Sequence, residues 1–377
     1  MTVLFTPFSI ANMEIKNRFV RSATYDGGAV KRGFVSEWQI NLYAELARGQ
    51  VGLIISGIFS VDSAGKISPV HNSLHHDRYI EGLARLANVV HRNGSRLAVQ
   101  LFHGGREAFR RQEALGRYAL GPSDLERNQD LYFKDRCRAM TREEIEALIE
   151  AFGKAAARAK EAGVDAVQVH GAHAYLLSEF LSPQSNRRKD MWGGSLENRV
   201  RLHKRICQAI RKAVGPDYPV MIKLGLADGF SGGLRLEEGL QAADVLAKSG
   251  FDAIEVSQGL RGKNYTEAEF RPKILKREHE AYFREWARNL KTRVRVPVIL
   301  VGGLRSPDLM EEIVRMGDAD LVAISRPLIR DPDLIASWSA SKERKAACIS
   351  CNGCYDLILT GAKLACVVEG RKKGLSQ

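Results

Sequence analysis

Two histidines and a tyrosine lie close together in the stretch VHGAHAYL, residues 169–176. His170 and His173 are three residues apart, and Tyr175 follows two residues later. Such a group can bind a metal, fill a core or donate hydrogen bonds to a substrate oxygen. Zinc needs three or four ligands, and no third histidine, cysteine or carboxylate is obvious near the pair. The pattern therefore favours donors to a substrate oxygen, with buried structural histidines as the alternative.

The chain has six cysteines, and four of them gather in the stretch CISCNGCYDLILTGAKLAC. Cys348, Cys351, Cys354 and Cys366 have the spacing C-x2-C-x2-C-x11-C. Clustered cysteines in a cytoplasmic chain indicate metal binding or redox chemistry rather than disulfides. Four thiolates can hold a [4Fe–4S] cluster or a zinc ion. A cluster, a zinc ion and free thiols all stay open at this point.

Two short motifs near the end of the chain are typical of an anion site. VGGLRSP places Gly303 and Leu304 after one apolar run, and AISRP places Ser325 and Arg326 after the next. Backbone N–H groups at Gly303 and Leu304, together with the Arg326 guanidinium, have the chemistry to hold a phosphate. A phosphate site after the seventh and eighth strands is common in α/β barrels. The alternative is a tight turn beside a surface arginine.

A single lysine, Lys223, interrupts the apolar stretch VMIKLG. A buried lysine needs a counter-charge or a polar ligand. It is therefore either half of an ion pair inside the protein or a cation beside the pyrimidine ring of a flavin. Gln100, near the end of LAVQL, can place an amide at the same ring edge.

These side chains need a scaffold, and short apolar runs alternate regularly with amphipathic stretches of helical length. Runs rich in β-branched residues are typical of buried parallel strands. Eight such strands close most simply into a (β/α)8 TIM barrel, with catalytic residues at the C-terminal strand ends. An open doubly wound sheet is the alternative, but RSATYDGG does not match its GxGxxG fingerprint. The expected strands are residues 18–24, 51–58, 96–102, 166–172, 219–225, 252–258, 297–303 and 321–327.

Several helices carry start and stop signals. Thr141 with Glu144 predicts a capping box, and Gly163 a helix end. Gly215 ends a second helix, and Ser306 is expected to cap a third. The leading FTPFSIANMEIKNR is expected to form a hairpin that plugs the barrel floor. We thus expect a (β/α)8 barrel over residues 1–340 and a short Cys-rich C-terminal extension over 341–377.

The composition is that of a soluble globular enzyme, with 45% hydrophobic and 27% charged residues. The net charge is +13, but lysine and arginine are scattered, so we expect anionic small molecules rather than nucleic acid. No apolar run approaches the roughly 18 residues of a membrane span, and the start lacks a signal-peptide pattern. We therefore expect a cytoplasmic protein without a membrane partner. The oligomeric state, including a homo-oligomer, is left open.

Several long stretches resemble the Old Yellow Enzyme family of FMN-dependent ene reductases, and together they cover nearly the whole chain. LFTPFSI…IKNRFVRSAT is similar to the family's opening, and VVHRNGSRLAVQLFHGGR to its third βα unit. The most specific piece is VHGAHAYLLSEFLSPQSNRRKDMWGGSLENRVRL. The resemblance implies an FMN-binding (β/α)8 barrel, with either Thr24 or Tyr25 facing the flavin. The implied FMN contacts are Ala23, Thr24, Tyr25, Gly57, Gln100, Lys223, Gly303, Leu304, Ser325 and Arg326.

The resemblance also implies roles for the opening motif. In the family, the residues matching His170 and His173 hydrogen-bond the oxygen of an activated alkene, and the one matching Tyr175 donates a proton. Hydride from flavin N5 reaches the β-carbon, charge grows on the oxygen, and the two donors stabilise it. The phenol then protonates the α-carbon. We therefore expect NAD(P)H-dependent reduction of a small electron-poor alkene, with NADH or NADPH and the alkene left open.

The longer relatives, such as 2,4-dienoyl-CoA reductase, are similar in the cysteine region but use C-x2-C-x3-C-x11-C. They also carry a second flavin domain that exchanges electrons with their cluster, which we do not expect in these 377 residues. A second function therefore stays open. The flavin would oxidise an amine or alcohol, and a cluster would pass the electrons to a protein acceptor. The histidine pair and Tyr175 favour the ene reductase, and the cysteines favour this alternative.

Overall fold

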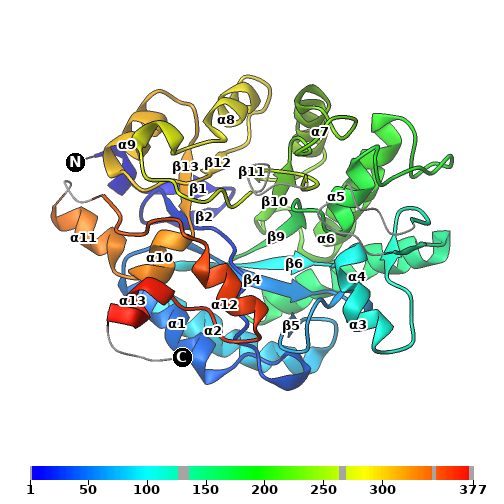
Figure 1. Cartoon of the computed structure of the whole chain (residues 1–377), viewed down its shortest axis with the longest axis horizontal. Helices are drawn as coiled ribbons and strands as arrows, with labels where there is room; N and C mark the ends of the chain where they lie inside the picture. Colours follow the sequence, from blue (N-terminus) through cyan, green and yellow to red (C-terminus); the bar gives the residue numbers. More distant parts are fainter. Residues whose placement is uncertain (1, 126–135, 263–268, 342–344, 373–377) are drawn as a thin grey trace.

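Eight parallel strands form a closed barrel that is ringed by helices (Figure 1). The computed structural model describes residues 2–125, 136–262, 269–341 and 345–372. Around the barrel the strand order is β3-β13-β12-β11-β10-β9-β6-β4, and pairing of β3 with β4 closes it. The predicted (β/α)8 barrel is confirmed, and each expected strand is found. The barrel strands are β3 (Phe19–Arg21), β4 (Leu53–Ser60), β6 (Arg96–Phe102), β9 (Ala166–Gly171), β10 (Val220–Gly225), β11 (Ala253–Ser257), β12 (Val298–Val301) and β13 (Leu321–Ile324).

The strand register brings polar side chains to neighbouring positions. Gln100 on β6 pairs with Gln168 on β9. His170 on β9 pairs with Lys223 on β10, which in turn pairs with Glu255 on β11. Since neighbouring parallel strands hold paired residues side by side, these polar groups lie together near the C-terminal end of the barrel.

A hairpin closes the opposite end of the barrel, as the sequence predicted. Strands β1 (Phe8–Ile10) and β2 (Met13–Ile15) pair in antiparallel fashion, with Ala11 at a φ of 49° in the turn. Ile10, Met13 and Ile15 are buried in one apolar cluster with inward-facing strand residues. The cluster fills the barrel floor and leaves the other end for ligands.

The helices begin and end largely where the sequence signals them. Thr141 and Glu144 form the expected capping box, and Gly163 and Gly215 have φ values of 77° and 88°. Ser306 is the exception. Its position is the N-cap of α9, but its hydroxyl donates to Glu280 instead of capping the helix. The barrel helices are α1 (Glu37–Arg48), α2 (Ile80–Arg92), α3 (Phe109–Glu113), α4 (Arg142–Glu161), α5 (Leu176–Leu181), α6 (Leu196–Val214), α7 (Leu236–Lys248), α8 (Arg284–Lys291), α9 (Pro307–Arg315), α10 (Arg326–Arg330) and α11 (Leu334–Ala340).

Shorter elements lie in the loops between them. Three two-residue strands and six short 3₁₀ turns join the barrel elements among the described residues. The short strands are β5 (Asn72–Ser73), β7 (Leu120–Gly121) and β8 (Arg138–Ala139). The 3₁₀ turns are Val3–Phe5, Lys31–Gly33, Ser63–Gly65, Asp77–Tyr79, Gly105–Ala108 and Arg277–His279.

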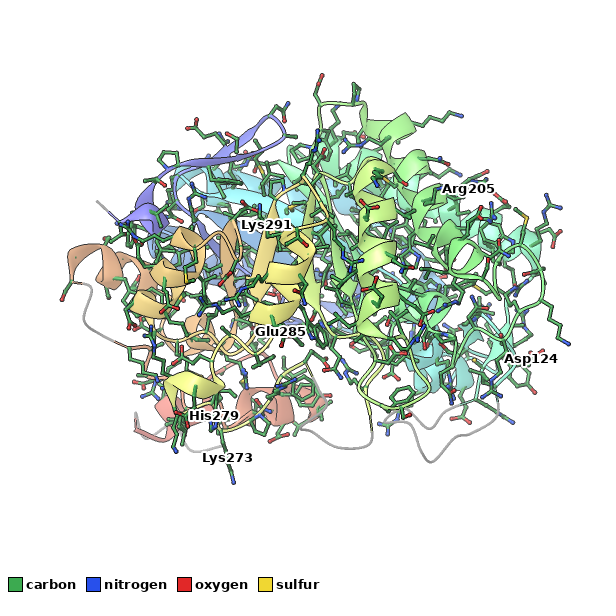
Figure 2. All side chains as sticks on the ribbon, turned by 90° about the horizontal axis from the view of Figure 1, so that it is seen from above. Asp124, Arg205, Lys273, His279, Glu285 and Lys291 are labelled. Carbon is green, nitrogen blue, oxygen red and sulfur yellow. The ribbon has the colours of Figure 1, made fainter. Side chains whose placement is uncertain are left out.

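The C-terminal extension packs against the barrel. Its helices α12 (Gly353–Leu359) and α13 (Val367–Lys372), drawn red in Figure 1, lie near α10. The Lys273 N–H donates to the Ser350 carbonyl, and the Leu364 N–H to the Asp26 carbonyl. Lys273 projects from the segment that borders the extension (Figure 2). The extension is therefore fastened to loops at the C-terminal ends of the strands. Among the described helices, none has the length and apolar character of a membrane span.

Candidate active site

A cavity of about 850 Å³ lies at the C-terminal ends of the barrel strands. Ligand pockets are typically roughly 300–1,000 Å³, so it has room for a large cofactor. Every residue predicted to contact FMN or substrate lines this cavity except Gly57. Gly57 lies behind Thr24, because a Cβ there would come within 2.9 Å of the Thr24 carbonyl oxygen. Gly57 thus lets the loop after β3 approach closely instead of forming the cavity wall.

The floor of the cavity is a hydrogen-bonded chain of buried polar side chains. The Gln100 amide donates to Gln168 Oε1 at 2.7 Å, and Gln168 donates to Glu255 Oε2 at 2.8 Å. The Ser22 hydroxyl donates to Glu255 Oε1 at 2.6 Å and accepts from Lys223 Nζ at 2.8 Å. Because every member has a partner, the chain holds Gln100 and Lys223 in place beneath any ligand.

Lys223 and Glu255 are the two charged side chains in this hydrogen-bonded network. Their Nζ and Oε1 atoms are 3.1 Å apart, and both side chains are almost fully buried. The internal ion pair that the sequence left open is therefore present, and Lys223 also faces the cavity. Sequence reasoning missed Glu255, although the argument applied to Lys223 would have found it. A carboxylate in the apolar run DAIEVSQ also needs a partner.

His170, His173 and Tyr175 meet at the end of β9. The His170 ring centroid is 5.0 Å from the centroids of both His173 and Tyr175. His173 and Ala174 have φ values of 62° and 61°, so the chain turns sharply just after the strand. This turn brings residues that are close in sequence to one wall of the cavity.

The two histidines differ in their hydrogen bonds. His170 Nδ1 accepts from the Ala172 N–H at 3.3 Å, so the ring proton is on Nε2 in the neutral form. His173 Nε2 lies 2.7 Å from the Ser257 hydroxyl, and its Nδ1 lies 4.0 Å from Glu269 Oε1. His170 therefore has a free N–H donor in the described part of the chain, whereas both nitrogens of His173 face protein groups.

Burial sets the protonation states of this group. It lowers the pKa of His170 and His173 well below the usual value, and the positive charge of Lys223 acts in the same direction. Burial raises the pKa of Tyr175 to about 12. At neutral pH the imidazoles are neutral and the phenol keeps its proton. The group can donate hydrogen bonds and a proton.

An arginine and a glutamate that sequence reasoning missed complete this wall. Arg261 follows β11, and its Nε lies 2.9 and 2.8 Å from the two carboxylate oxygens of Glu269. Both side chains line the cavity, and Arg261 is buried. The stretch GLRGKNYTEAE, residues 259–269, gave no periodic or motif signal that would have singled them out.

The loop after β12 is the place where the sequence predicted an anion site. Gly303 has a φ of 72°, and in the described part of the chain no hydrogen bond is recorded from the N–H groups of Gly303 and Leu304. The next two N–H groups, of Arg305 and Ser306, instead donate to the carboxylate of Glu280. Two backbone donors are thus available to a phosphate.

Arg326 lies on the same side of the cavity. Its Nη1 donates to the Arg271 carbonyl at 2.9 Å and to Asn352 Oδ1 at 2.5 Å. Asn352 lies between Cys351 and Cys354, so Arg326 joins the predicted phosphate site to the cysteine segment. Its charge remains at the cavity wall.

Thr24 and Tyr25 both reach the cavity. The Thr24 hydroxyl lies 2.7 Å from that of Ser325 and donates to the Ser22 carbonyl. The Tyr25 hydroxyl lies 2.8 Å from that of Ser68. Both side chains form part of the wall, so both alternatives that the sequence left open are compatible with the cavity.

All four clustered cysteines line one hollow of about 20 Å³, and Cys354 also reaches the large cavity. Burial raises the pKa of Cys354 to about 11, and the neighbouring Cys348 and Cys351 add to the shift. No group of three or more His, Cys, Asp or Glu within the described ranges is arranged around a single metal ion. The thiolates of an iron–sulfur cluster bind separate iron corners, so they lie farther apart than ligands of one ion.

Comparisons with known proteins agree with this geometry. The model of the NADH:flavin oxidoreductase / NADH oxidase family matches residues 3–344. An NADH oxidase from Thermoanaerobacter brockii is 36% identical over 370 residues, covering 97% of this chain and 56% of that protein. An NADPH dehydrogenase from Geobacillus sp. (strain WCH70) is 36% identical, covering 91% of this chain and 94% of that protein. The chain therefore spans about half the length of the first relative and nearly all of the second.

Solved structures share the fold over most of the chain. 2-Naphthoyl-CoA reductase superposes with a TM-score of 0.88 at 28% identity, covering 97% of this chain and 56% of that one. Histamine dehydrogenase from Rhizobium sp. 4-9 has a TM-score of 0.85 at 27% identity, covering 97% and 52%. An old yellow enzyme homologue from Zymomonas mobilis has a TM-score of 0.76 at 24% identity, covering 91% and 94%, and supports the fold alone.

Proposed function

The chain belongs to the NADH:flavin oxidoreductase / NADH oxidase family, and on this premise we propose that it is an FMN-dependent reductase of electron-poor C=C bonds that uses NAD(P)H. The observation that carries the proposal is the pairing of two features in one cavity. One is a set of hydrogen-bond donors suited to the phosphate and the ring of a flavin. The other is the neutral histidine–tyrosine group beside it.

The residues present fit FMN. The N–H groups of Gly303 and Leu304, with Arg326, would hold the phosphate. Gln100 and Lys223 would meet the polar edge of the ring from the cavity floor. When bound, FMN would supply the hydride chemistry between NAD(P)H and the β-carbon of the alkene.

Side chains of the protein would then stabilise the charge on the substrate oxygen and supply the proton for the α-carbon. His170 would donate its Nε2–H to the substrate oxygen, where negative charge accumulates. His173 can add a second donor only by giving up its contact with Ser257 or Glu269. Tyr175 holds the proton destined for the α-carbon. The substrate is thereby expected to be a small molecule with a carbonyl, carboxyl or nitro group.

Anaerobic half-reactions test this function. NADPH or NADH, deuterated at the transferred position, should bleach the flavin absorbance, and 2-cyclohexenone should restore it. The saturated product should carry deuterium at the β-carbon. Failure of both nicotinamides to reduce the protein, or failure of the enone to reoxidise it, would reject the proposal.

The second candidate is a dehydrogenase that passes electrons through a [4Fe–4S] cluster on Cys348, Cys351, Cys354 and Cys366. Its support is the single hollow lined by all four cysteines beside Arg326, together with the similarity to histamine dehydrogenase. We infer that the extension, residues 341–377, serves as this cluster-binding segment of the barrel protein. Iron and sulfide analysis of anaerobically prepared protein should give about four of each per chain, whereas zinc or no metal would refute the cluster.

A further inference from the structure

Arg261 lies between Tyr175, the proposed proton donor, and the partly buried carboxylate of Glu269. Its guanidinium carbon lies 5.7 Å from the centroid of the Tyr175 ring. Its Nε and Nη2 bind the carboxylate of Glu269, with Nη2 2.5 Å from Oε1. The guanidinium therefore contacts the phenol and the carboxylate together.

Glu269 fixes the arginine in this place. Both of its oxygens accept from Arg261, and its Oε1 is also 4.0 Å from His173 Nδ1. The Tyr282 hydroxyl donates to the Glu269 backbone carbonyl at 2.5 Å, which anchors the backbone as well. A planar guanidinium bound at two points keeps its direction better than a lysine would.

The contact has a consequence for the phenol. A tyrosine hydroxyl donates one hydrogen bond and accepts up to two. Since arginine can only donate, a hydrogen bond between the two residues must be accepted by the phenol oxygen, and it leaves the O–H of Tyr175 for another partner. That partner can be a ligand, because both residues line the cavity.

We propose that Arg261, held by Glu269, is the positioning residue for Tyr175: it donates to the phenol oxygen, which leaves the O–H for the substrate, and its charge stabilises the phenolate left by proton transfer. This inference rests on the proposed function, in which a hydride has already reached the β-carbon. The O–H bond of Tyr175 then breaks and a C–H bond forms at the α-carbon. The O–H electron pair stays on the phenolate oxygen, which regains a proton from water.

Several groups around Tyr175 act on its acidity. Burial and the carboxylates of Glu107 and Glu269 raise its pKa, and Arg261 lowers it. The His170 ring, 5.0 Å away, is neutral at the working pH. Arg261 is therefore the group that offsets the cost of a buried phenolate.

The test reads the ionisation of residue 175 directly. Tyr175 is replaced in the FMN-loaded protein by 3,5-difluorotyrosine, whose phenol ionises at lower pH, and ¹⁹F NMR follows the titration. Arg261→Gln should raise the pKa of the fluorinated phenol by about one unit or more, because an opposite charge at this range shifts a pKa by roughly 1–3 units. Arg261→Lys keeps the charge but not the two-point geometry. The pKa of the fluorinated phenol in this variant should therefore fall between those in the wild type and in Arg261→Gln.

Arg110→Gln is the matched control, because Arg110 lines the same cavity but is exposed. It should move the pKa much less than Arg261→Gln. An unchanged or lowered pKa in Arg261→Gln, or in Arg261→Lys should the glutamine variant not fold, would overturn the proposal. FMN binding and flavin reduction by NAD(P)H are measured on the same samples, so a failure of the proposed function is seen separately.

Discussion

Lys223 and Glu255 form an ion pair inside the barrel, with Nζ 3.1 Å from Oε1. The two residues are register partners on β10 and β11, and both are buried. Breaking a buried pair by removing one partner leaves the other charge uncompensated and costs roughly 3–5 kcal/mol. The same two residues therefore contribute to the stability of the barrel and set the charge beneath the proposed flavin.

Removing Lys223 and removing Glu255 should shift the reduction potential of bound FMN in opposite directions. Lys223→Met deletes a cation that favours the anionic reduced cofactor, so the midpoint potential should fall. Glu255→Gln deletes the counter-charge, so the midpoint potential should rise. A differential effect of about 1.4 kcal/mol corresponds to roughly 30 mV for a two-electron couple. Dye-equilibration titration measures both shifts, and shifts of the same sign would contradict the placement of Lys223.

Tyr175→Phe removes the transferable proton and keeps the ring that packs 4.5 Å, centroid to centroid, from Phe102. Enone-dependent reoxidation should slow by about 10²–10⁴-fold, the usual contribution of a general acid. Reduction by NAD(P)H should stay within about twofold of the wild type. Stopped-flow absorbance separates the two half-reactions, and an equal loss in both would rule out the proton-donor role.

His170→Ala should weaken binding of a phenolic charge-transfer ligand more than His173→Ala. His170 has an Nε2–H to offer, whereas His173 already contacts Ser257 and Glu269. Loss of a hydrogen bond to a charged ligand costs about 1.5–3 kcal/mol, or roughly tenfold or more in Kd. Long-wavelength absorbance titrations measure Kd. If the His173 variant is the weaker binder, the assignment of donors is wrong.

Glu179 gives a prediction about pH and stability. Burial raises its pKa to about 8, although Arg106 opposes the shift. An unfolded glutamate ionises near pH 4.3, so the folded state holds an extra proton between about pH 4 and pH 8. The free energy of unfolding should therefore fall as pH rises through this window, by up to about 1.4 kcal/mol per pH unit.

Glu179→Gln keeps an oxygen that can accept from the Arg106 N–H, as Glu179 Oε1 does at 3.0 Å. Urea unfolding at pH 5, 6.5 and 8 should show a flatter pH dependence in this variant than in the wild type. Glu161→Gln, at the exposed end of α4, is the control. Parallel curves for wild type and Glu179→Gln would refute the account of this carboxyl.

The sequence predicted the barrel because buried parallel strands are short, nearly continuous apolar runs, and polar residues such as His170 and Lys223 stand out at their ends. It missed Gln168 and Glu255 as partners, because only the strand register shows which polar residues meet inside the barrel. The Arg261–Glu269 contact joins two residues that lie outside helices and strands, where no periodicity operates.

Two predictions show how tertiary contacts override local signals. Ser306 occupies an N-cap position, but the Glu280 carboxylate accepts both its N–H and its hydroxyl. Gly57 was given as a flavin contact by the resemblance, but it is not among the residues that line the cavity, and it lies against the backbone of Thr24. Neither outcome follows from propensity or spacing, because each depends on a loop distant in sequence.

The central claim is that the cavity at the barrel mouth holds FMN. The most direct measurement is the absorption spectrum of the purified protein, followed by chromatography of the flavin released on heating. The account predicts flavin absorbance and one FMN per chain, and Arg326→Ala, which removes a proposed phosphate contact, should lower that stoichiometry. Colourless protein that does not bind added FMN, or a released flavin other than FMN, would contradict it.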